Sequence, residues 1–466
     1  MAAQSKYGKA TPEFLDKIRG IVGSQNVLAD KDSLKRHATD ATNVIFRMPE
    51  AVVRAGSTEE VSRVLRLCNE ARVPVTPRGG GTGLSGGAMP VQAGVVLTLD
   101  RMNRILDIDR DAMAAVVEAG VTTRSLQEAV EAVGLFYPPD LPTSGSSTLA
   151  GNIAHNAGGT RAVKYGVTRD WVLGCEAVLP TGEVIRSGGK LVKSSTGYNL
   201  TQLLIGSEGT LAVVTQLTLR LRPFPAHSWT LVAPFADMRS AARLGPELFR
   251  MGVVPRTLEL MERAAVRAVE EKTGESYAVG DGNVVALVEV DGTDPGAVEA
   301  EAAKVGEACA RLASGEVAVC DTAAKVQRIW KMRDSFGEIL RPRVMRAPDV
   351  VVPRSKVPDF FKALDEVKAK YPAFETIAFG HAGDGNIHLM VMKGNTAEWR
   401  DTVNKAVEEV YRRVVALGGT ISAEHGIGSV NREYLKLAFS PEEIGLMRRI
   451  KAAFDPGGIL NPGKIF

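Results

Sequence analysis

The sequence predicts an α+β protein built from more than one domain. Residues 1–222 contain many short apolar segments with strand-like alternation, separated by glycine-rich loops, and only a few helical segments. After Pro223 and Pro225, longer strands alternate with amphipathic helices. A length of 466 residues suits two or three domains, because a single hydrophobic core rarely grows past about 250–300 residues.

Composition and charge exclude several classes of function. The 57 Lys and Arg residues nearly balance the 54 Asp and Glu residues. The sequence has no basic stripe with interleaved aromatic residues, so we do not expect it to bind nucleic acid. The four cysteines lack CxxC spacing, which indicates buried free thiols in a reducing compartment. The polar N-terminus is unlike a signal peptide. The sequence has no run of 18 apolar residues, so we expect no membrane-spanning helix. We expect a cytoplasmic protein that reaches a membrane only through a partner.

The elements of residues 1–222 begin with a helical pattern over 11–37, where Thr11, Pro12 and Glu13 are typical of a helix N-terminus. A second helix begins after Ser57, and a third spans 123–134. Strands are predicted at 51–55, 73–76, 95–99, 116–119, 171–179, 184–186 and 212–221.

The loop at 77–87 is the richest glycine stretch of the chain, with six glycines in the nine residues 79–87. Successive backbone N–H groups in such a loop can form an anion-binding nest. Gly81, Gly83 and Gly86 match GxGxxG, but a strand follows the loop where a nicotinamide-binding fold has a helix. We therefore expect a dinucleotide bound in another manner, and the alternative is a flexible loop without a ligand.

A second loop candidate is the stretch 143–159, which is small, polar and uncharged. Such a stretch suits hydrogen bonding to a ribityl chain and to a ring edge. His155 lies within it, and we interpret His155 as packed or hydrogen-bonded and not as a catalyst.

Beyond residue 222 the pattern is strand, helix, strand. Strands are predicted at 229–234, 284–290, 317–320, 349–353 and 420–423, and helices at 238–251, 255–270, 297–312, 326–340, 358–370, 404–417, 433–437 and 444–453.

Two of the six histidines lie in the stretch 380–388, Gly-His-Ala-Gly-Asp-Gly-Asn-Ile-His. Strands are predicted at 376–379 and 387–392, and the Asp-Gly pair between them is a hairpin turn signal. A tight turn there brings His381 and His388 together on neighbouring strands.

A third histidine, His425, follows Glu424 directly after the predicted strand at 420–423. Two imidazoles and a carboxylate can hold a divalent metal and leave positions open for substrate. We expect a metal on His381, His388 and Glu424, with His425 left as a base. The alternative is a pair of hairpin histidines satisfied by hydrogen bonds.

Arg333, on the predicted helix 326–340, is the candidate carboxylate clamp. A guanidinium offers two parallel donors that match a carboxylate. The alternative is a surface arginine paired with Glu338 or Asp334, a kind of pair that contributes little to stability.

Several motifs in this order resemble the FAD-linked oxidase family of the vanillyl-alcohol oxidase (PCMH) type. More closely, the chain is similar to its branch of glycolate oxidase D-subunits, D-lactate dehydrogenases and D-2-hydroxyglutarate dehydrogenases. The resemblance covers roughly residues 30–466 and rests on 77–87, 138–144, 151–159, Tyr165-Gly166, 206–211, the Trp330-x-x-Arg333 motif and 461–464.

The resemblance implies a PCMH-type FAD-binding domain of two α+β subdomains over 1–222. A cap domain over 223–425, with an antiparallel sheet covered by helices, would carry the metal site. A helical segment over 426–466 would return to the flavin. Gly81 stands where some relatives carry a flavin-linking histidine, so we expect non-covalent FAD.

The resemblance also implies which residues contact the cofactor, with the pyrophosphate on 78–83. The expected contacts are Pro77, Arg78, Gly79, Gly80, Gly81, Thr82, Gly83, Leu84, Gly87, Pro139, Asp140, Thr143, Ser144, Gly151, Asn152, Ala154, Asn156, Gly158, Gly159, Tyr165, Gly166, Glu208, Gly209, Val213 and Asn461.

The implied reaction is oxidation of a D-2-hydroxy acid, D-lactate or glycolate first, to the 2-oxo acid. Arg333 would hold the carboxylate, the metal would bind the 2-hydroxyl, and His425 would remove the proton. Substrate contacts are expected from Arg333, Arg346, Asn386 and His425. The metal is expected to be zinc, with iron and manganese as alternatives.

Reduced flavin needs an electron acceptor, which would be a quinone, an electron-transferring flavoprotein, a cytochrome or an iron–sulfur subunit. Oxygen is a further alternative. D-2-hydroxyglutarate or D-malate would need a second cation, for which Arg346 and Lys325 are candidates. Competing interpretations are another FAD-linked alcohol oxidase and a flavin-binding subunit without catalysis. A homodimer is one option for the assembly.

Overall fold

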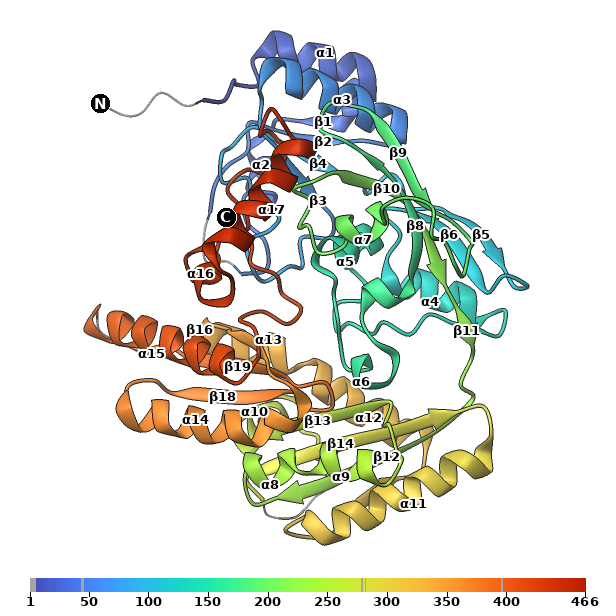
Figure 1. The fold of residues 1–466 in the computed structure, drawn as a ribbon, viewed down its shortest axis with the longest axis vertical. Helices are drawn as coiled ribbons and strands as arrows, with labels where there is room; N and C mark the ends of the chain where they lie inside the picture. Colours follow the sequence, from blue (N-terminus) through green and yellow to red (C-terminus); the bar gives the residue numbers. More distant parts are fainter. Residues whose placement is uncertain (1–5, 43–45, 278–279, 281, 395–396) are drawn as a thin grey trace. The chain divides into compact units, whose positions relative to one another are not determined.

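The computed structural model of the chain describes residues 6–42, 46–277, 280, 282–394 and 397–466. The chain forms two compact units (Figure 1). The first unit comprises Met1–Ala157, Val167–Pro223 and Glu424–Phe466, and the second comprises Gly158–Gly166 and Phe224–Ala423.

A four-stranded sheet in the first unit leads into the glycine loop. Its strands lie in the order β1 (Val27–Leu28), β2 (Ala51–Arg54), β4 (Val95–Thr98) and β3 (Val75–Arg78). The pairs β2–β4 and β3–β4 are parallel, and β1 is antiparallel to β2. Helices α1 (Pro12–Val22) and α3 (Thr58–Ala71) turn apolar faces to the core that these strands share. Burial of this shared apolar face fixes the end of β3, where the loop begins.

The single helix predicted over 11–37 is wrong. Gly23 adopts a φ of 87°, which ends α1, and a 3-10 turn and β1 follow. Asp30 then caps a separate helix, α2 (Lys31–Arg36), by accepting the backbone N–H of Ser33. The turn residues Gly23 and Asp30 therefore outweigh the helical spacing of the apolar residues.

A five-stranded antiparallel sheet also lies in the first unit. Its strands lie in the order β5 (Ile105–Asp109), β6 (Ala114–Glu118), β10 (Val213–Arg220), β8 (Val172–Val178) and β9 (Val184–Gly188). A two-stranded pair joins β7 (Leu135–Phe136) to β11 (Arg222–Pro223). Further elements of the unit are α4 (Thr123–Glu131), α5 (Leu149–His155), α7 (Leu200–Leu204), α16 (Leu435–Ala438) and α17 (Pro441–Phe454).

The C-terminal segment returns to β3. The Val75 N–H donates to the Ile459 carbonyl at 2.9 Å, and the Asn461 N–H donates to the Val75 carbonyl at 2.7 Å. This bridge places the tail beside the strand that carries the glycine loop.

The second unit is built on an antiparallel sheet with helices on both faces (Figure 1). The strands lie in the order β15 (Ala318–Cys320), β12 (His227–Phe235), β14 (Val284–Gly292), β13 (Thr257–Glu262), β18 (Thr376–His381), β19 (Asn386–Met392) and β16 (Val344–Arg346), and β17 (Asp349–Val351) also pairs with β19. The helices are α6 (Ala162–Tyr165), α8 (Met238–Ala242), α9 (Leu244–Arg250), α10 (Arg263–Thr273), α11 (Pro295–Leu312), α12 (Ala323–Asp334), α13 (Phe336–Leu340), α14 (Val357–Lys370) and α15 (Ala397–Ala416).

The helix predicted over 255–270 is wrong in its first half. Residues Thr257–Glu262 form β13, which pairs with β14 on one side and β18 on the other, and the helix α10 begins only at Arg263. Sheet neighbours on both sides outweigh local helix propensity. The predicted helices 238–251 and 326–340 each divide in two, at Arg243 and Ser335. The predicted strand 420–423 is a pair of isolated bridges to β17.

In the described part of the chain, no helix has the length and apolar character needed to cross a membrane. All four cysteines are free thiols, as predicted, and three are buried while Cys320 is half-buried. Burial raises the pKa of the Cys309 thiol to about 12.

Candidate active site

The glycine loop of the first unit is folded back by the residue that precedes it. Arg78 Nη1 donates to the carbonyls of Thr39, at 2.7 Å, and Ala88, at 3.4 Å. A Cβ atom added at Gly80 would lie 2.0 Å from the Ser146 carbonyl oxygen. Glycine is therefore required at Gly80 by the protein's own packing.

This packing does not use the backbone N–H groups of the loop. Within the described residues, the N–H groups of residues 79–83 donate no hydrogen bond to the protein. Free successive N–H groups bind anions, so the loop fits the pyrophosphate of a dinucleotide. A Cβ at Gly83 would meet only His155, 3.5 Å from its Nε2 atom.

The tail holds the loop from its C-terminal end. Asn461 Nδ2 donates to the Gly87 carbonyl at 3.0 Å and to the Glu208 carbonyl at 2.7 Å. Lys464 Nζ donates to the Met89 carbonyl at 2.5 Å. Burial lowers the pKa of Lys464 to about 8, although Glu208 and Asp40 oppose the shift. Lys464 was not among the predicted site residues.

Glu208 uses its carboxylate within the protein. Its two oxygens accept the N–H groups of Ile427 and Gly428, each at 2.7 Å. Glu208 was predicted to contact the cofactor, and its carboxylate holds the chain just after His425 in place.

His155 carries an unsatisfied atom beside the loop. Its Nδ1 is buried and has no hydrogen-bond partner within the described residues. Cβ atoms added at Gly87 and Gly426 would lie 3.0 Å from its Cε1 and 2.8 Å from its Nδ1. Buried polar atoms of native proteins are nearly always paired, so a ligand atom that reaches Nδ1 would complete this cradle. The cradle therefore fits a bound FAD.

Other predicted cofactor residues are engaged by the protein. Asn152 Nδ2 donates to Thr123 Oγ1 at 2.7 Å, and Asn156 Oδ1 accepts the Arg169 N–H at 2.9 Å. The Tyr165 hydroxyl donates to Asp291 at 2.8 Å in the second unit. Gly158, Gly159 and Gly166 also belong to the second unit, whereas Pro77, Thr82, Leu84, Pro139, Asp140, Thr143, Ser144, Gly151, Ala154, Gly209 and Val213 belong to the first.

The predicted hairpin is present in the second unit. His381 ends β18 and His388 lies in β19, and their Nε2 atoms are 3.4 Å apart with the rings perpendicular. Gly380 and Gly385 take φ values of 155° and 93°, which favour glycine. The turn therefore brings the two imidazoles together as predicted.

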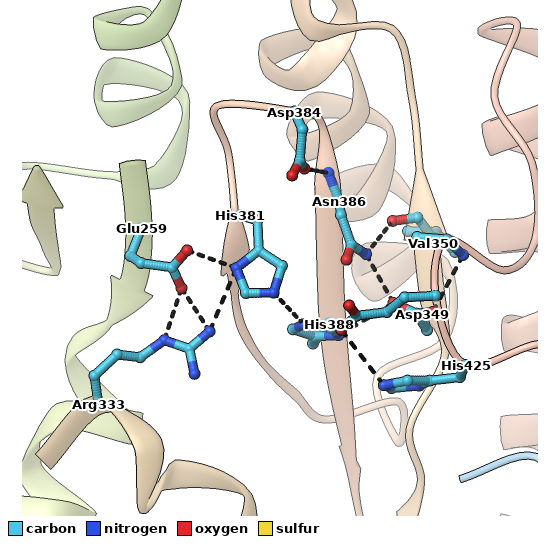
Figure 2. A network of polar contacts seen from close by, with 11 residues as sticks. Glu259, Arg333, Asp349, Val350, His381, Asp384, Asn386, His388 and His425 are labelled. Atoms are coloured by element: carbon cyan, nitrogen blue, oxygen red, sulfur yellow. Dashed lines mark hydrogen bonds and ion pairs between the residues drawn. The ribbon is translucent and has the colours of Figure 1, made fainter. Parts of the chain in front are cut away.

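Strand register places a buried carboxylate opposite each histidine (Figure 2). Glu259 of β13 lies opposite His381, and its Oε1 is 2.5 Å from Nδ1. Asp349 of β17 lies opposite His388, and its Oδ1 is 3.2 Å from Nδ1. Residues directly opposite on adjacent strands share one face, so the register creates both pairs.

The carboxylate of Glu259 assigns the tautomer of His381. It accepts Nδ1–H of His381, so Nε2 of that ring presents a lone pair. Nδ1 of His388 lies at ion-pair distance from Asp349, and Nε2 of His388 faces Nε2 of His381. Two ring nitrogens that face each other at 3.4 Å suit a proton or a cation between them. Carboxylate–histidine pairs of this kind orient metal ligands in proteins. His381 and His388 therefore fit a divalent cation.

Arg333 is buried beside the same carboxylate. Its Nη2 and Nε lie 2.5 and 2.7 Å from Glu259 Oε2, and only 4% of its side chain is exposed. The surface alternative for Arg333 is therefore wrong. Burial alone would raise the pKa of Glu259, but the charge of Arg333 and the His381 imidazole lower it to about 2. Nη1 of Arg333 donates to none of the described residues, so one edge of the guanidinium is left for a ligand.

The other predicted substrate residues are tied to the protein. Arg346 Nη1 donates to Asn404 Oδ1 at 3.0 Å. Asn386 Nδ2 donates to Asp349 Oδ1 at 2.7 Å, which holds the partner of His388. Lys325 is exposed and pairs with Asp321 at 2.8 Å.

Glu424 and His425 are half-buried and are the first residues of the first unit after Ala423. Glu424 Oε1 lies 3.9 Å from His425 Nε2. The roles predicted for them as metal ligand and base stay predictions.

Sequence reasoning missed Glu259 and Asp349. Each is an acidic residue inside an apolar segment, Thr-Leu-Glu-Leu-Met for Glu259 and Asp-Val-Val-Val for Asp349. A buried carboxylate needs a partner, which is the signal that was available.

Two family models match this chain. A family model described as the C-terminal domain of FAD linked oxidases matches residues 224–465, and one described as an FAD binding domain matches 49–188. The glycolate oxidase subunit GlcD of Bacillus subtilis (strain 168) is 37% identical, over 98% of this chain and 97% of the relative. The D-lactate dehydrogenase of Archaeoglobus fulgidus is 41% identical, over 89% and 90%. The D-2-hydroxyglutarate dehydrogenase of Stutzerimonas stutzeri is 36% identical, over 98% and 99%.

Among solved structures, p-cresol methylhydroxylase superposes with a TM-score of 0.79 at 21% identity, covering 98% of this chain and 97% of that one. At this identity the likeness concerns the fold alone. It confirms the predicted α+β fold class of the PCMH type.

The Gly83→Ala variant separates ligand approach from packing. Gly83 is not in a left-handed conformation, and its Cβ would make only an ordinary contact, so the variant should fold. The added methyl group would occupy open space beside His155 on the loop that is expected to bind the cofactor, and we expect FAD affinity to fall at least about 10-fold. Titration of flavin-free protein with FAD, followed by flavin fluorescence, measures this.

Gly80→Ala is the matched control, because its Cβ collides with the Ser146 carbonyl oxygen. It should lower the thermal midpoint of the flavin-free protein by several degrees, at about 2–4 °C per kcal/mol for a unit of this size, while Gly83→Ala leaves it nearly unchanged. Unchanged FAD affinity in Gly83→Ala would contradict the assignment of the loop.

Glu259 should make stability depend on pH in acid. Its pKa is about 2 in the folded chain against an ordinary 4.5, so its stabilisation is complete above pH 4.5 and is lost as the pH falls toward 2. The difference in unfolding free energy between wild type and Glu259→Gln should shrink by up to about 3 kcal/mol over that range. Urea unfolding at a series of pH values measures it, and a difference that stays constant with pH would disprove the assignment.

Proposed function

The chain belongs to the family of FAD-linked oxidases, and from this premise we propose that it oxidises a small D-2-hydroxy acid, D-lactate or glycolate first, to the 2-oxo acid. It is an FAD-linked oxidoreductase. The observation that carries the proposal is the pair of facing Nε2 atoms, 3.4 Å apart, beside a buried arginine. Relatives named for glycolate, D-lactate and D-2-hydroxyglutarate support the substrate class.

FAD would be held by the loop and the tail of the first unit. The free N–H groups of residues 79–83 would bind its pyrophosphate, and Nδ1 of His155 would meet a polar atom of the cofactor. When bound, FAD accepts the two electrons and the C2 hydrogen of the substrate. Gly81 in place of a histidine supports non-covalent binding.

A divalent cation would be held by Nε2 of His381 and Nε2 of His388. Glu424 would add a carboxylate as the third ligand. The N–H of Ala423 donates to Asp349 Oδ2 at 3.1 Å, and the next Cα, that of Glu424, follows within about 3.8 Å along the chain. When bound, such a cation is a Lewis acid that favours ionisation of a hydroxyl. Zinc is the first candidate, and iron and manganese suit the same donors.

Arg333 would hold the substrate carboxylate. Glu259 occupies Nε and Nη2 and so fixes the plane of the guanidinium, while Nη1 is left for the substrate. Phe379 lies under the guanidinium, 5.6 Å from its centre, and limits movement of the head group. His425 would take the proton of the 2-hydroxyl, because an imidazole titrates near neutral pH.

The substrate would be small. Arg346 and Lys325, the cations considered for a second carboxylate, already have partners in Asn404 and Asp321. D-2-hydroxyglutarate and D-malate are therefore the second candidates. Another FAD-linked alcohol oxidation would leave the paired histidines without a role. Electrons would pass to a separate acceptor: a quinone, an electron-transferring flavoprotein, a cytochrome or an iron–sulfur subunit.

Anaerobic reduction of the bound flavin tests this proposal. D-lactate, L-lactate, glycolate, D-malate and D-2-hydroxyglutarate are added in turn to the FAD-loaded protein, with and without prior chelation. We expect rapid loss of the absorbance near 450 nm, roughly where oxidised flavins absorb, with D-lactate or glycolate. Chelation should abolish it and zinc, iron or manganese should restore it. Reduction that ignores the chelator would remove the cation from the mechanism, and reduction by none of the acids would refute the proposal.

The His425→Gln variant tests the proton acceptor. A general base contributes roughly 10²–10⁴-fold, so the rate of flavin reduction should fall at least about 100-fold while FAD and metal content are retained. His227→Gln, at an exposed position at the start of β12, is the matched control and should reduce the flavin at the wild-type rate. A His425→Gln enzyme that reduces its flavin normally would exclude His425 as the base.

A further inference from the structure

The geometry points to Glu259 as a positioning residue that couples the clamp Arg333 to the metal ligand His381. One carboxylate fixes the tautomer of the imidazole and the plane of the guanidinium together. This inference rests on the proposed function, in which His381 binds a cation and Arg333 binds the substrate carboxylate.

The two oxygens of Glu259 divide the contacts between them (Figure 2). Oε1 accepts Nδ1–H of His381 at 2.5 Å, and Oε2 accepts Nε–H and Nη2–H of Arg333 at 2.7 and 2.5 Å. Glu259 is completely buried on β13, directly opposite His381. An unpaired polar group at such a buried site is costly, so loss of one contact favours rearrangement of the other.

The second histidine provides the contrast. His388 lies beside Asp349, which also accepts the Asn386 amide and the Ala423 N–H. Both histidines thus have a carboxylate behind Nδ1, but only the carboxylate behind His381 also binds the guanidinium.

The Glu259→Gln variant exposes the coupling, because an amide has only one accepting oxygen. Arg333 is charged and buried, so the amide oxygen turns to the guanidinium. The amide NH2 group then faces Nδ1 of His381 and forces the proton onto Nε2. In that tautomer His381 has no lone pair for a cation.

Removing the cation of Arg333 should reverse this effect. In Glu259→Gln combined with Arg333→Met, the amide oxygen is free to accept Nδ1–H of His381, and the metal-binding tautomer returns. If Glu259→Gln simply damaged the structure, the further substitution Arg333→Met would not be expected to restore zinc affinity.

The test measures zinc affinity of the FAD-loaded full-length chain, stripped of metal, by competition with a chromophoric chelator. Loss of a partner behind a ligating histidine lowers affinity about 10–100-fold, which is expected for Glu259→Gln and for Asp349→Asn. Arg333→Met should bind zinc within about 3-fold of wild type, and so should the Glu259→Gln/Arg333→Met double variant. Adding Arg333→Met to Asp349→Asn should rescue nothing.

Unchanged zinc affinity in Glu259→Gln, or a double variant as weak as Glu259→Gln, would overturn the coupling. If Glu259→Gln does not fold, the double variant is compared with Glu259→Leu/Arg333→Met, which has no acceptor for His381. Equal zinc affinities of those two would likewise overturn it. A wild-type chain without measurable zinc affinity would refute the proposed metal role itself, which is a distinct result.

Discussion

The buried ion pair between Glu259 and Arg333 is the constraint on which the second unit depends. A charge removed from water is tolerated only with a partner, and removal of one partner from such a pair is strongly destabilising. Glu259 comes from β13, Arg333 from α12 and His381 from β18, so one carboxylate joins elements far apart in the sequence. Phe379 and Met261 carry the same sheet face onward as an apolar core. The polar site therefore lies at the edge of that core, and packing against the core holds its side chains in place.

In the first unit, the glycine loop keeps a defined conformation although several of its backbone N–H groups are unpaired among the described residues. Its glycine loop gets its order from side chains that contact its carbonyls: Arg78 at one end, Asn461 and Lys464 at the other. The N–H groups of residues 79–83 are not needed for this purpose and stay available. Because the tail supplies two of these contacts, the last residues of the sequence belong to the cradle formed near its start.

Local sequence patterns were sufficient for some features and not for others. The hairpin and the glycine loop depend on residues within ten positions of one another, and both were predicted. Glu259 was missed because the apolar residues of 255–270 have helical spacing. Pairing with β14 and β18 makes Thr257–Glu262 a strand. Asp349 and Lys464 escaped because their partners lie 39 and 375 residues away in the chain. Register between distant strands decides which carboxylate meets which histidine, and no single segment encodes register.

The charge arrangement also bears on selectivity. Glu259 cancels the charge of Arg333, so within the second unit the guanidinium acts as a directional donor and not as a source of net positive potential. A directional donor recognises the plane of one carboxylate but gives little attraction to a second. Arg346 and Lys325, the two cations considered for a second carboxylate, already contact Asn404 and Asp321. A dicarboxylate held by Arg333 would have to bury its second charge without these two cations as partners, which is why we propose a substrate with one carboxylate.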